Sequence, residues 1–394
     1  FASIQRSVQT DLAQVGWRVG AIQTSNIVGS IVGSILTGAV FFQFFGTPAT
    51  ATLLICLGSV FVLLTIRAVP GRPVKWVGIG AVMISLGMAF AIPTSSEFWS
   101  RFHTPHGPVS PVVEDASGLA TIQAMSPEQS YLRVNGKGHS VLPFGDVHTL
   151  LGLLPVLMRS DTGNALVIGL GSGDTTWAVG SSPGVNRIDV YEIVAPEAAV
   201  IRDWSHNGEP YLPMVKLFSE PRIHMNFSDG RLALRLEDRL YGLIEADGLE
   251  PSSPYSGNLY SREFFELAKS KLVPGGLFLT YVPTERTLRT LVSAFPYVLD
   301  FHAPQFASLG MGSNEPLTFD PAQIMREFKR PEVQAYLKES GAQRSVHALL
   351  ARYLRQVKVT SIDPSNRELY LDGDINTDLF PRDEFDKDYR GTYQ

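Results

Sequence analysis

The chain of 394 residues contains a single cysteine, Cys56, which excludes an intrachain disulfide framework and a metal site built from several cysteines. It also has no basic excess, because 38 Asp and Glu residues outnumber 33 Lys and Arg residues and give a formal net charge of −5. Proteins that bind nucleic acid usually present a basic face. We therefore expect neither a nucleic-acid partner nor a bound metal.

Charged residues are scarce, at 18% of the chain, and three long stretches near its start contain none. These stretches run from Val19 to Phe45, from Ala49 to Ile66 and from Trp76 to Ser96. A membrane-spanning helix needs ~18 or more mostly apolar residues, so we predict about three spans in contact with membrane lipid within residues 1–97. Gly29 and Gly33 in the first stretch would allow other membrane helices, or a second copy of the chain, to pack closely.

The start of the chain also bears on topology. Because the first residue is Phe1 rather than Met, we expect the natural N-terminus to lie upstream. Arg67, Arg72 and Lys75 lie between the second and third stretches, and the positive-inside tendency places them in the cytoplasm. One more span would then place the chain after the third stretch outside the cell. A domain that uses a nucleoside cofactor is expected in the cytoplasm, and the sequence leaves this conflict open.

Residues 98–145 predict a linker and a small β-subdomain. Two short apolar runs, 119–125 and 131–134, precede Asn135 and Gly136, a pair typical of a tight hairpin turn. His103 and His106 in the linker have no acidic or cysteine neighbour, and we assign them no role.

The stretch from Asn164 to Thr175 organises the rest of the chain. A short aliphatic run is followed by Gly169, Gly171 and Gly173 and then by Asp174, a pattern typical of a buried strand that enters a glycine turn before a helix. Glycines permit positive φ and close approach of a ligand, although such turns also join strands to helices without any ligand.

Residues 146–300 alternate between strand and helix patterns, beginning with an apolar helix that Asp146 is expected to cap. This alternation predicts an α/β, Rossmann-like domain with a parallel sheet. The carboxyl ends of its strands lie at one edge, so we expect the glycine turn to meet three acids there, namely Glu192, Asp229 and Asp247.

The spacing of Glu192 indicates which ligand this edge would take. It lies about 20 residues after the glycine turn, where a carboxylate can accept hydrogen bonds from ribose hydroxyls. No run of Lys or Arg suits a pyrophosphate, so the sequence favours a nucleoside without phosphates, such as an S-adenosyl compound, over NAD.

These motifs resemble those of the spermidine synthase-like polyamine aminopropyltransferases, especially the bacterial branch fused to membrane helices. The resemblance covers nearly the whole chain and includes the glycine motif, the strand ends and the segment with Asp247. The similar segments are 164–175, 190–193, 228–231, 244–251, 256–265, 274–276 and 375–378.

The resemblance implies a transferase in the bacterial inner membrane that binds decarboxylated S-adenosylmethionine, or S-adenosylmethionine, and a small-molecule amine. The donor would lie against Gly169, Gly171, Gly173 and Asp174, with Glu192 at its ribose and with Asp229 and Gly230 at its adenine. The catalytic residues would be Asp247, which orients the acceptor amine and helps to remove its proton, and Tyr255.

The sequence departs from the family pattern near the acceptor. Val194 and Leu153 stand where family members often carry a carboxylate and a histidine, and Glu250 replaces an aspartate. His148, together with Tyr255, is a candidate substitute. Two alternatives therefore stay open: a methyltransferase on the same framework, and a non-catalytic membrane-complex subunit that retains the fold.

Residues 301–394 predict a helical cap that packs on the sheet, followed by an acidic tail from Asp372 to Asp388. The expected tail is solvated, and the alternative is an arm that binds a partner.

Overall fold

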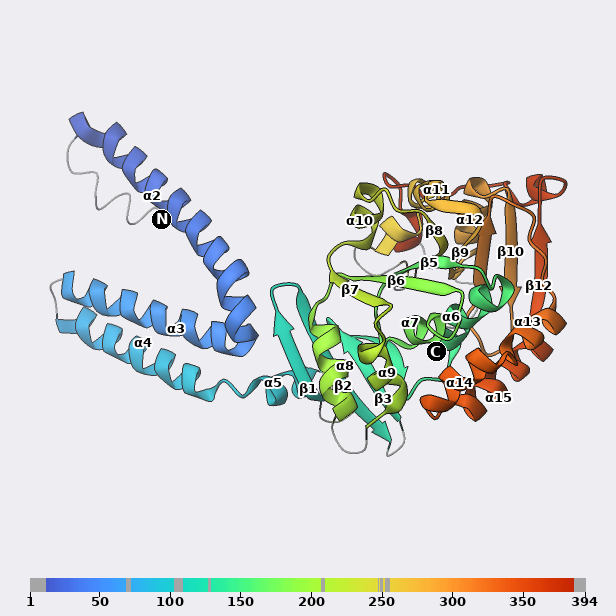
Figure 1. Cartoon of the computed structure of the whole chain (residues 1–394). Helices are drawn as coiled ribbons and strands as arrows, with labels where there is room; N and C mark the ends of the chain where they lie inside the picture. The colour runs from blue at the N-terminus through green and yellow to red at the C-terminus, as the bar shows by residue number, and fades with distance from the viewer. Residues whose placement is uncertain are drawn as a thin grey trace. The chain divides into compact units, whose positions relative to one another are not determined.

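The computed structural model describes residues 12–68, 72–102, 109–126, 129–206, 210–246, 248, 251 and 256–385 (Figure 1). The chain forms two compact units, residues 1–119 and residues 120–394. The sequence predicts boundaries after residues 97, 145 and 300, and these stay a prediction.

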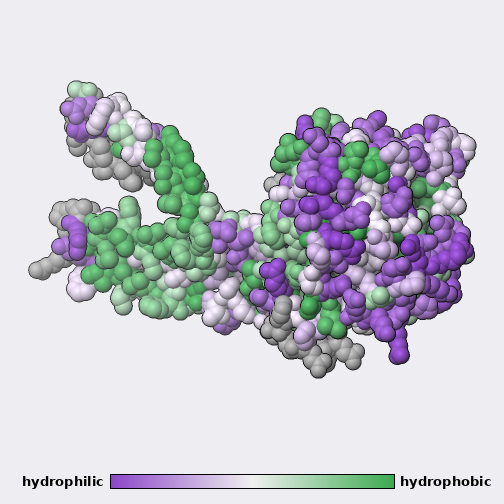
Figure 2. Space-filling view, in the orientation of Figure 1, coloured by the Kyte–Doolittle hydropathy of each residue, from purple (hydrophilic) through white to green (hydrophobic). Residues whose placement is uncertain are grey.

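The first unit consists mainly of long helices. Its elements are η1 (Leu12–Gln14), α2 (Val15–Ile35), η2 (Leu36–Phe41), α3 (Phe42–Ala68), α4 (Arg72–Ala91), α5 (Ser95–Phe102) and β1 (Val109–Asp115). Figure 2 shows hydrophobic side chains gathered over these helices, and several large ones are more than two-thirds exposed, among them Trp17, Phe61 and Phe90.

In the described part of the chain, one helical run is long and apolar enough to cross a membrane, from Val15 to Arg67. A second would qualify only if Lys75–Ala91 and Ser95–Phe102, bent by 83° at a break, formed one span. The structure therefore supports one apolar N-terminal helix and does not support a multi-pass arrangement; the number of spans stays a prediction from the sequence.

Gly46 interrupts the long helical run. Its φ of 71° and ψ of 179° lie outside the helical region, and a Cβ there would lie 2.9 Å from Oε2 of Glu114. The same carboxylate accepts a hydrogen bond from the backbone N–H of Thr47 at 2.9 Å. Glu114 thus satisfies a backbone donor that the break leaves without a helical partner.

The boundary between the units falls within β2 (Gly118–Ser126), which forms an antiparallel meander with β3 (Gln129–Val134) and β4 (Lys137–Leu142). Asn135 and Gly136 join β3 to β4 with φ of 49° and 83°. The hairpin predicted at this pair is confirmed.

A mixed sheet of eight strands forms the centre of the second unit, in the order β12-β10-β11-β9-β8-β5-β6-β7. The five strands from β9 to β7 in this order are parallel, and β11, β10 and β12 are antiparallel to their neighbours. Their bounds are β5 (Gly163–Ile168), β6 (Val185–Glu192), β7 (Ile223–Phe227), β8 (Tyr241–Ala246), β9 (Leu272–Tyr281), β10 (Tyr297–His302), β11 (Leu309–Ser313) and β12 (Lys358–Ile362). The predicted Rossmann-like α/β fold is confirmed.

Helices cover both faces of this sheet, with α10, α11 and α12 on one side and α6 and α7 on the other (Figure 1). Their bounds are α6 (Val147–Met158), α7 (Asp174–Val179), α8 (Pro196–His206), α9 (Leu212–Ser219), α10 (Gly230–Leu236), η3 (Ser256–Leu259), α11 (Arg262–Ser270) and α12 (Glu285–Ala294). Phe264 and Phe265 of α11 meet Phe278 of β9, whose ring stacks on Phe295. Burial of these large apolar side chains fixes the helices on the sheet.

The C-terminal range contains the expected helices α13 (Pro321–Phe328), α14 (Pro331–Glu339) and α15 (Gln343–Gln356), followed by η4 (Arg367–Tyr370) and η5 (Arg382–Glu384). It also supplies β11 and β12 to the sheet, which a purely helical cap would not. Most of residues 372–385 are exposed or half-buried, as expected of a solvated tail, but Asn376 and Asp383 are buried, at 1% and 2% exposed.

Candidate functional site

The glycine turn follows β5 at the carboxyl edge of the parallel strands. Gly169, Gly171 and Gly173 have φ of 101°, 51° and 87°, values that residues with a Cβ rarely adopt. The N–H of Gly169 donates to the carbonyl oxygen of Tyr191 at 2.9 Å, and that of Gly173 to the carbonyl oxygen of Leu170 at 2.8 Å. The first bond holds the turn against the end of β6, and the second closes the turn on itself.

Glu192 ends β6 beside this turn and is buried. Its Oε2 accepts a hydrogen bond from the N–H of Leu170 at 2.8 Å, and its Oε1 accepts one from the N–H of Val194 at 2.7 Å. Each carboxylate oxygen can accept more than one hydrogen bond. These two hydrogen bonds therefore fix the orientation of the side chain.

Asp174 begins α7 and is buried against the start of α6. Its two carboxylate oxygens each lie 2.7 Å from Oγ1 of Thr149, and Oδ2 accepts a hydrogen bond from the N–H of Gly145 at 3.2 Å. Burial, and then the nearby charge of Asp146, raise the pKa of Asp174 to about 7. This carboxyl can therefore exist in either protonation state near neutral pH.

Asp146 caps α6, as the sequence predicted, by accepting a hydrogen bond from the N–H of His148 at 2.9 Å. Its Oδ1 also lies 2.7 Å from Nδ1 of His148. Burial alone would raise the pKa of Asp146, but the His148 ring outweighs it and holds that pKa below its usual value. The His148 ring meets the ring of Tyr281, at the end of β9, edge to face.

Two residues of β4 that the sequence did not single out adjoin this site. Oγ of Ser140 accepts a hydrogen bond from the N–H of Ser172 at 3.3 Å, which ties the meander to the glycine turn. His139 is largely buried, with Nδ1 3.8 Å from Oε1 of Glu197, and burial lowers its pKa to about 3. Strand β4 shows no motif, so only the paired sheet and turn reveal these contacts.

Asp229 and Gly230 lie after β7, two strands from the glycine turn. Asp229 is exposed and caps α10 by accepting a hydrogen bond from the N–H of Leu232 at 2.9 Å. A Cβ on Gly230 would lie 2.8 Å from Cγ2 of Ile168, so the start of α10 approaches the end of β5 closely. The structure thus gives Asp229 a local capping function, and its contact with adenine stays a prediction.

Asp247 and Tyr255, the predicted catalytic residues, and Glu250 lie outside the described residues. The strand end before Asp247 is held, because Oγ1 of Thr280 donates to the carbonyl oxygen of Ala246 at 3.1 Å. On the other side, the hydroxyl of Tyr260 donates to the carbonyl oxygen of Gly248 at 3.3 Å.

Among the residues from 12 to 385 that the structure describes, no group of three or more His, Cys, Asp or Glu side chains is arranged to hold a metal ion.

Comparison with known proteins finds relatives among enzymes named for polyamine chemistry. A polyamine aminopropyltransferase from Nitrosomonas europaea is 24% identical over 200 residues, which are 48% of this chain and 58% of that enzyme. One from Clostridium perfringens is 30% identical over 119 residues, 30% of this chain and 39% of that enzyme. Putrescine N-methyltransferase 2 from Nicotiana attenuata is 31% identical over 135 residues, 34% of this chain and 33% of that enzyme.

The matches thus span less than two thirds of the length of each of these relatives. No family model matches the chain. Among solved structures, a spermidine synthase bound to the transition-state analogue AdoDATO is 17% identical with a TM-score of 0.47, over 59% of this chain and 88% of that one. A probable spermidine synthase from Corynebacterium glutamicum is 18% identical with a TM-score of 0.46, over 69% and 97%.

Proposed function

We propose that this chain, which is spermidine synthase-like, transfers an aminopropyl group from decarboxylated S-adenosylmethionine to a small amine. The family resemblance found in the sequence is confirmed by the curated aminopropyltransferase relatives. The activity and the substrates are our proposal.

One observation carries the proposal, namely the hydrogen bond that joins Glu192 to the glycine turn. It holds a buried carboxylate beside a backbone segment of positive φ at the carboxyl edge of a parallel sheet, where ligands of such folds bind. The arrangement contains no cluster of basic side chains from the turn itself, and this supports a nucleoside without phosphates.

The residues fit such a donor. Glu192 would accept hydrogen bonds from the ribose hydroxyls, and the backbone from Gly169 to Gly173 would lie along the nucleoside. Asp174, with a pKa near 7, would sit close to the cationic end of the donor and favour its positive charge when ionised. We place Asp229 and Gly230 on the adenine side, as the resemblance implies.

The bound donor supplies a carbon activated by a sulfonium leaving group. The acceptor nitrogen must present a lone pair in line with that carbon, so the ammonium form has to lose a proton first. The C–N bond forms as the C–S bond breaks, which leaves neutral methylthioadenosine and a secondary ammonium, so one proton is released in each transfer. Asp247 is our candidate for orienting the amine and accepting its first proton.

Incubation of the full chain with decarboxylated S-adenosylmethionine and a panel of di- and polyamines tests this proposal. We expect release of methylthioadenosine that depends on the amine. Folded protein that binds the nucleoside but releases no methylthioadenosine with any amine would instead support the hypothesis of a non-catalytic subunit.

A methyltransferase is the second candidate, and the similarity to putrescine N-methyltransferase is the observation that favours it. The same assay discriminates between the two, because S-adenosylmethionine would then be consumed and S-adenosylhomocysteine released.

We also propose that the apolar unit of residues 1–119 attaches the chain to a membrane. Trp17, Phe61 and Phe90 are large apolar side chains that are mostly exposed, and lipid would cover them where water would not. The full chain should remain in the membrane fraction after alkaline carbonate extraction, and its release by carbonate would contradict the proposal.

A further inference from the structure

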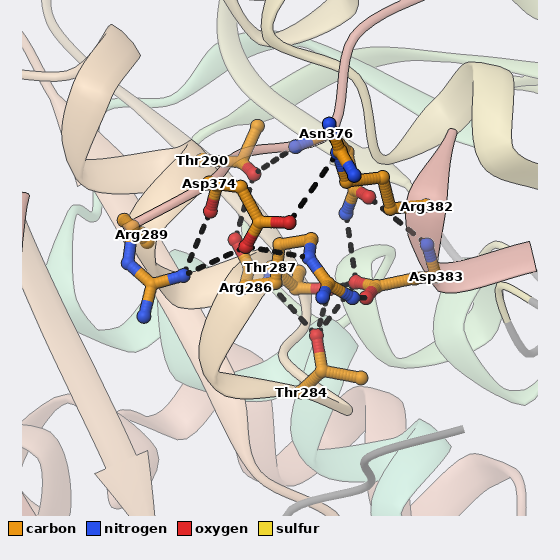
Figure 3. A network of polar contacts seen from close by, with 9 residues as sticks. All are labelled: Thr284, Arg286, Thr287, Arg289, Thr290, Asp374, Asn376, Arg382 and Asp383. Carbon is orange, nitrogen blue, oxygen red and sulfur yellow. Dashed lines mark hydrogen bonds and ion pairs between the residues drawn. The ribbon is translucent and has the colours of Figure 1, made fainter. Parts of the chain in front are cut away.

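The C-terminal segment from Asp374 to Glu384, here called the strap, lies across the second unit and makes polar contacts with segments more than 80 residues away in sequence (Figure 3). It follows the last strand of the sheet and has no part in the motifs that indicate the donor site. Its contacts divide into an anchor and two tips.

The anchor is Asp383, whose buried carboxylate faces the start of α12 (Figure 3). It accepts hydrogen bonds from Oγ1 of Thr284 at 2.6 Å and of Thr287 at 2.9 Å, and it pairs with Arg286 at 2.5 Å. Asn376 closes the strap on itself by donating to Asp383 at 2.7 Å. A buried charge with this many partners holds the strap in one position.

The first tip is Asp378, which binds Arg231 of α10 through two parallel bonds of 2.8 and 2.6 Å. These hydrogen bonds hold the pKa of Asp378 below its usual value. Arg231 also donates to the carbonyl oxygen of Asn258 at 2.7 Å. Asp378 therefore orients a guanidinium that joins α10, beside the predicted adenine side, to η3.

The second tip is Glu384, whose Oε1 accepts a hydrogen bond from the N–H of Gly257 at 3.1 Å. A Cβ on Gly257 would lie 2.5 Å from that oxygen and 2.7 Å from Cβ of Pro381. The strap thus approaches η3 so closely that glycine is required there.

Both tips act on η3, which directly follows Tyr255, one of the two predicted catalytic residues. Asn258 and Gly257 belong to η3, and the adjacent Tyr260 is buried and donates to the carbonyl oxygen of Gly248, next to Asp247 in the chain. A continuous set of contacts therefore runs from the strap through η3 to the residue after Asp247.

We infer that the strap is a positioning element of the proposed transferase, with Asp378 and Glu384 holding η3 and, through the adjacent Tyr260, the carbonyl of Gly248. This inference rests on the proposed function. It assigns to the acidic C-terminal segment an internal role in place of binding a separate partner.

Three single variants of the full chain test it: Glu384→Ala, Asp378→Asn and, as the matched control, Asp374→Asn. Asp374 lies in the same strap, but its side chain pairs with Arg286, Arg289 and Arg382 and does not contact η3. We expect kcat to fall about tenfold or more in the first two, because small displacements of a reacting group are costly, with KM for the donor nearly unchanged. Glu384→Gln, which keeps an acceptor oxygen, should restore most of the rate.

Hydrogen exchange of the peptide from 247 to 260 provides a readout that does not need activity. It should become faster in Glu384→Ala and Asp378→Asn and stay unchanged in Asp374→Asn. Gly257→Ala, which displaces the strap without removing any of its groups, should behave like Glu384→Ala.

The outcomes separate the two proposals. Normal rates and unchanged exchange in the tip variants overturn the inference, as does an equal loss of rate and stability in all three variants. If the wild-type chain transfers no aminopropyl group, the proposed function fails, and the exchange pattern alone then supports or overturns the positioning role.

Discussion

The backbone N–H of Leu170 donates a hydrogen bond of 2.8 Å to Oε2 of Glu192, so the end of β6 and the turn after β5 form one rigid edge. Leu170 lies within the glycine turn and Glu192 is buried, so the bond is shielded from water. Any nucleoside held by this carboxylate is positioned against the turn by the same contact.

Replacement of Glu192 by Gln should weaken nucleoside binding. The NH2 group of the new amide would face one of the two backbone N–H groups that the carboxylate now accepts from, so one hydrogen bond is lost. Hydrogen bonds to charged groups contribute about 1.5–3 kcal/mol, or roughly tenfold to a hundredfold in affinity. Calorimetric titration with methylthioadenosine measures the loss.

The control for this experiment is Glu220→Gln, which removes a carboxylate that pairs with Arg222 before β7, at the opposite edge of the sheet. An equal affinity in wild type and Glu192→Gln would show that the carboxylate does not bind the ribose.

Asp174→Asn should change how stability depends on pH. Because the pKa of Asp174 is raised from 3.8 to about 7, the folded chain keeps a proton that the unfolded chain has lost over this range. The contribution of Asp174 to the free energy of unfolding is therefore fully present below pH 3.8. It falls by roughly 1–4 kcal/mol in total as the pH rises to about 7. Urea unfolding should show that the wild type loses more stability than the variant between pH 5 and pH 8. An equal change in the two proteins would contradict the raised pKa of Asp174.

His139→Gln should produce the opposite dependence. Burial lowers the pKa of His139 from 6.5 to about 3, so its neutral form stabilises the fold above pH 6.5, and this contribution is lost as the pH falls to about 3. The wild-type chain should lose stability on acidification faster than the variant does. Equal losses of stability in the wild type and in His139→Gln between pH 7 and pH 4 would contradict this prediction.

Gly173→Ala should destabilise the second unit. The residue has a φ of 87°, and a Cβ would lie 2.2 Å from Cδ2 of Leu217, so strain and overpacking together should cost about 2–4 kcal/mol. Gly163→Ala is the control, since it has a φ of 69° with nothing within 4 Å of the added Cβ. Equal unfolding free energies in the two variants would show that the contact with Leu217 adds nothing.

Local pattern was enough to predict the strand and glycine turn around which the proposed donor site is built. The aliphatic run before Gly169 and the spacing to Glu192 indicated a strand, a glycine turn and an acid at the next strand end, because buried strands, positive φ and strand order are expressed in short runs of sequence. The hairpin at Asn135 and the cap at Asp146 were predicted for the same reason. The long apolar stretches indicated helices, but their composition does not determine how many cross a membrane.

By itself the sequence therefore determined the fold class and the family that these motifs resemble. Only the tertiary structure decided that Thr149 binds Asp174 and that Ser140 accepts a hydrogen bond from the glycine turn. The same holds for the ion pair of Asp378 with Arg231, which lies 147 residues away in the chain. Such contacts join segments that are distant in the chain, and they form only when packing of the sheet and helices brings their side chains within hydrogen-bonding distance. The sequence did not show that Asp383 of the acidic C-terminal segment is buried, because Thr284, Arg286 and Thr287, which bind it, belong to another part of the chain.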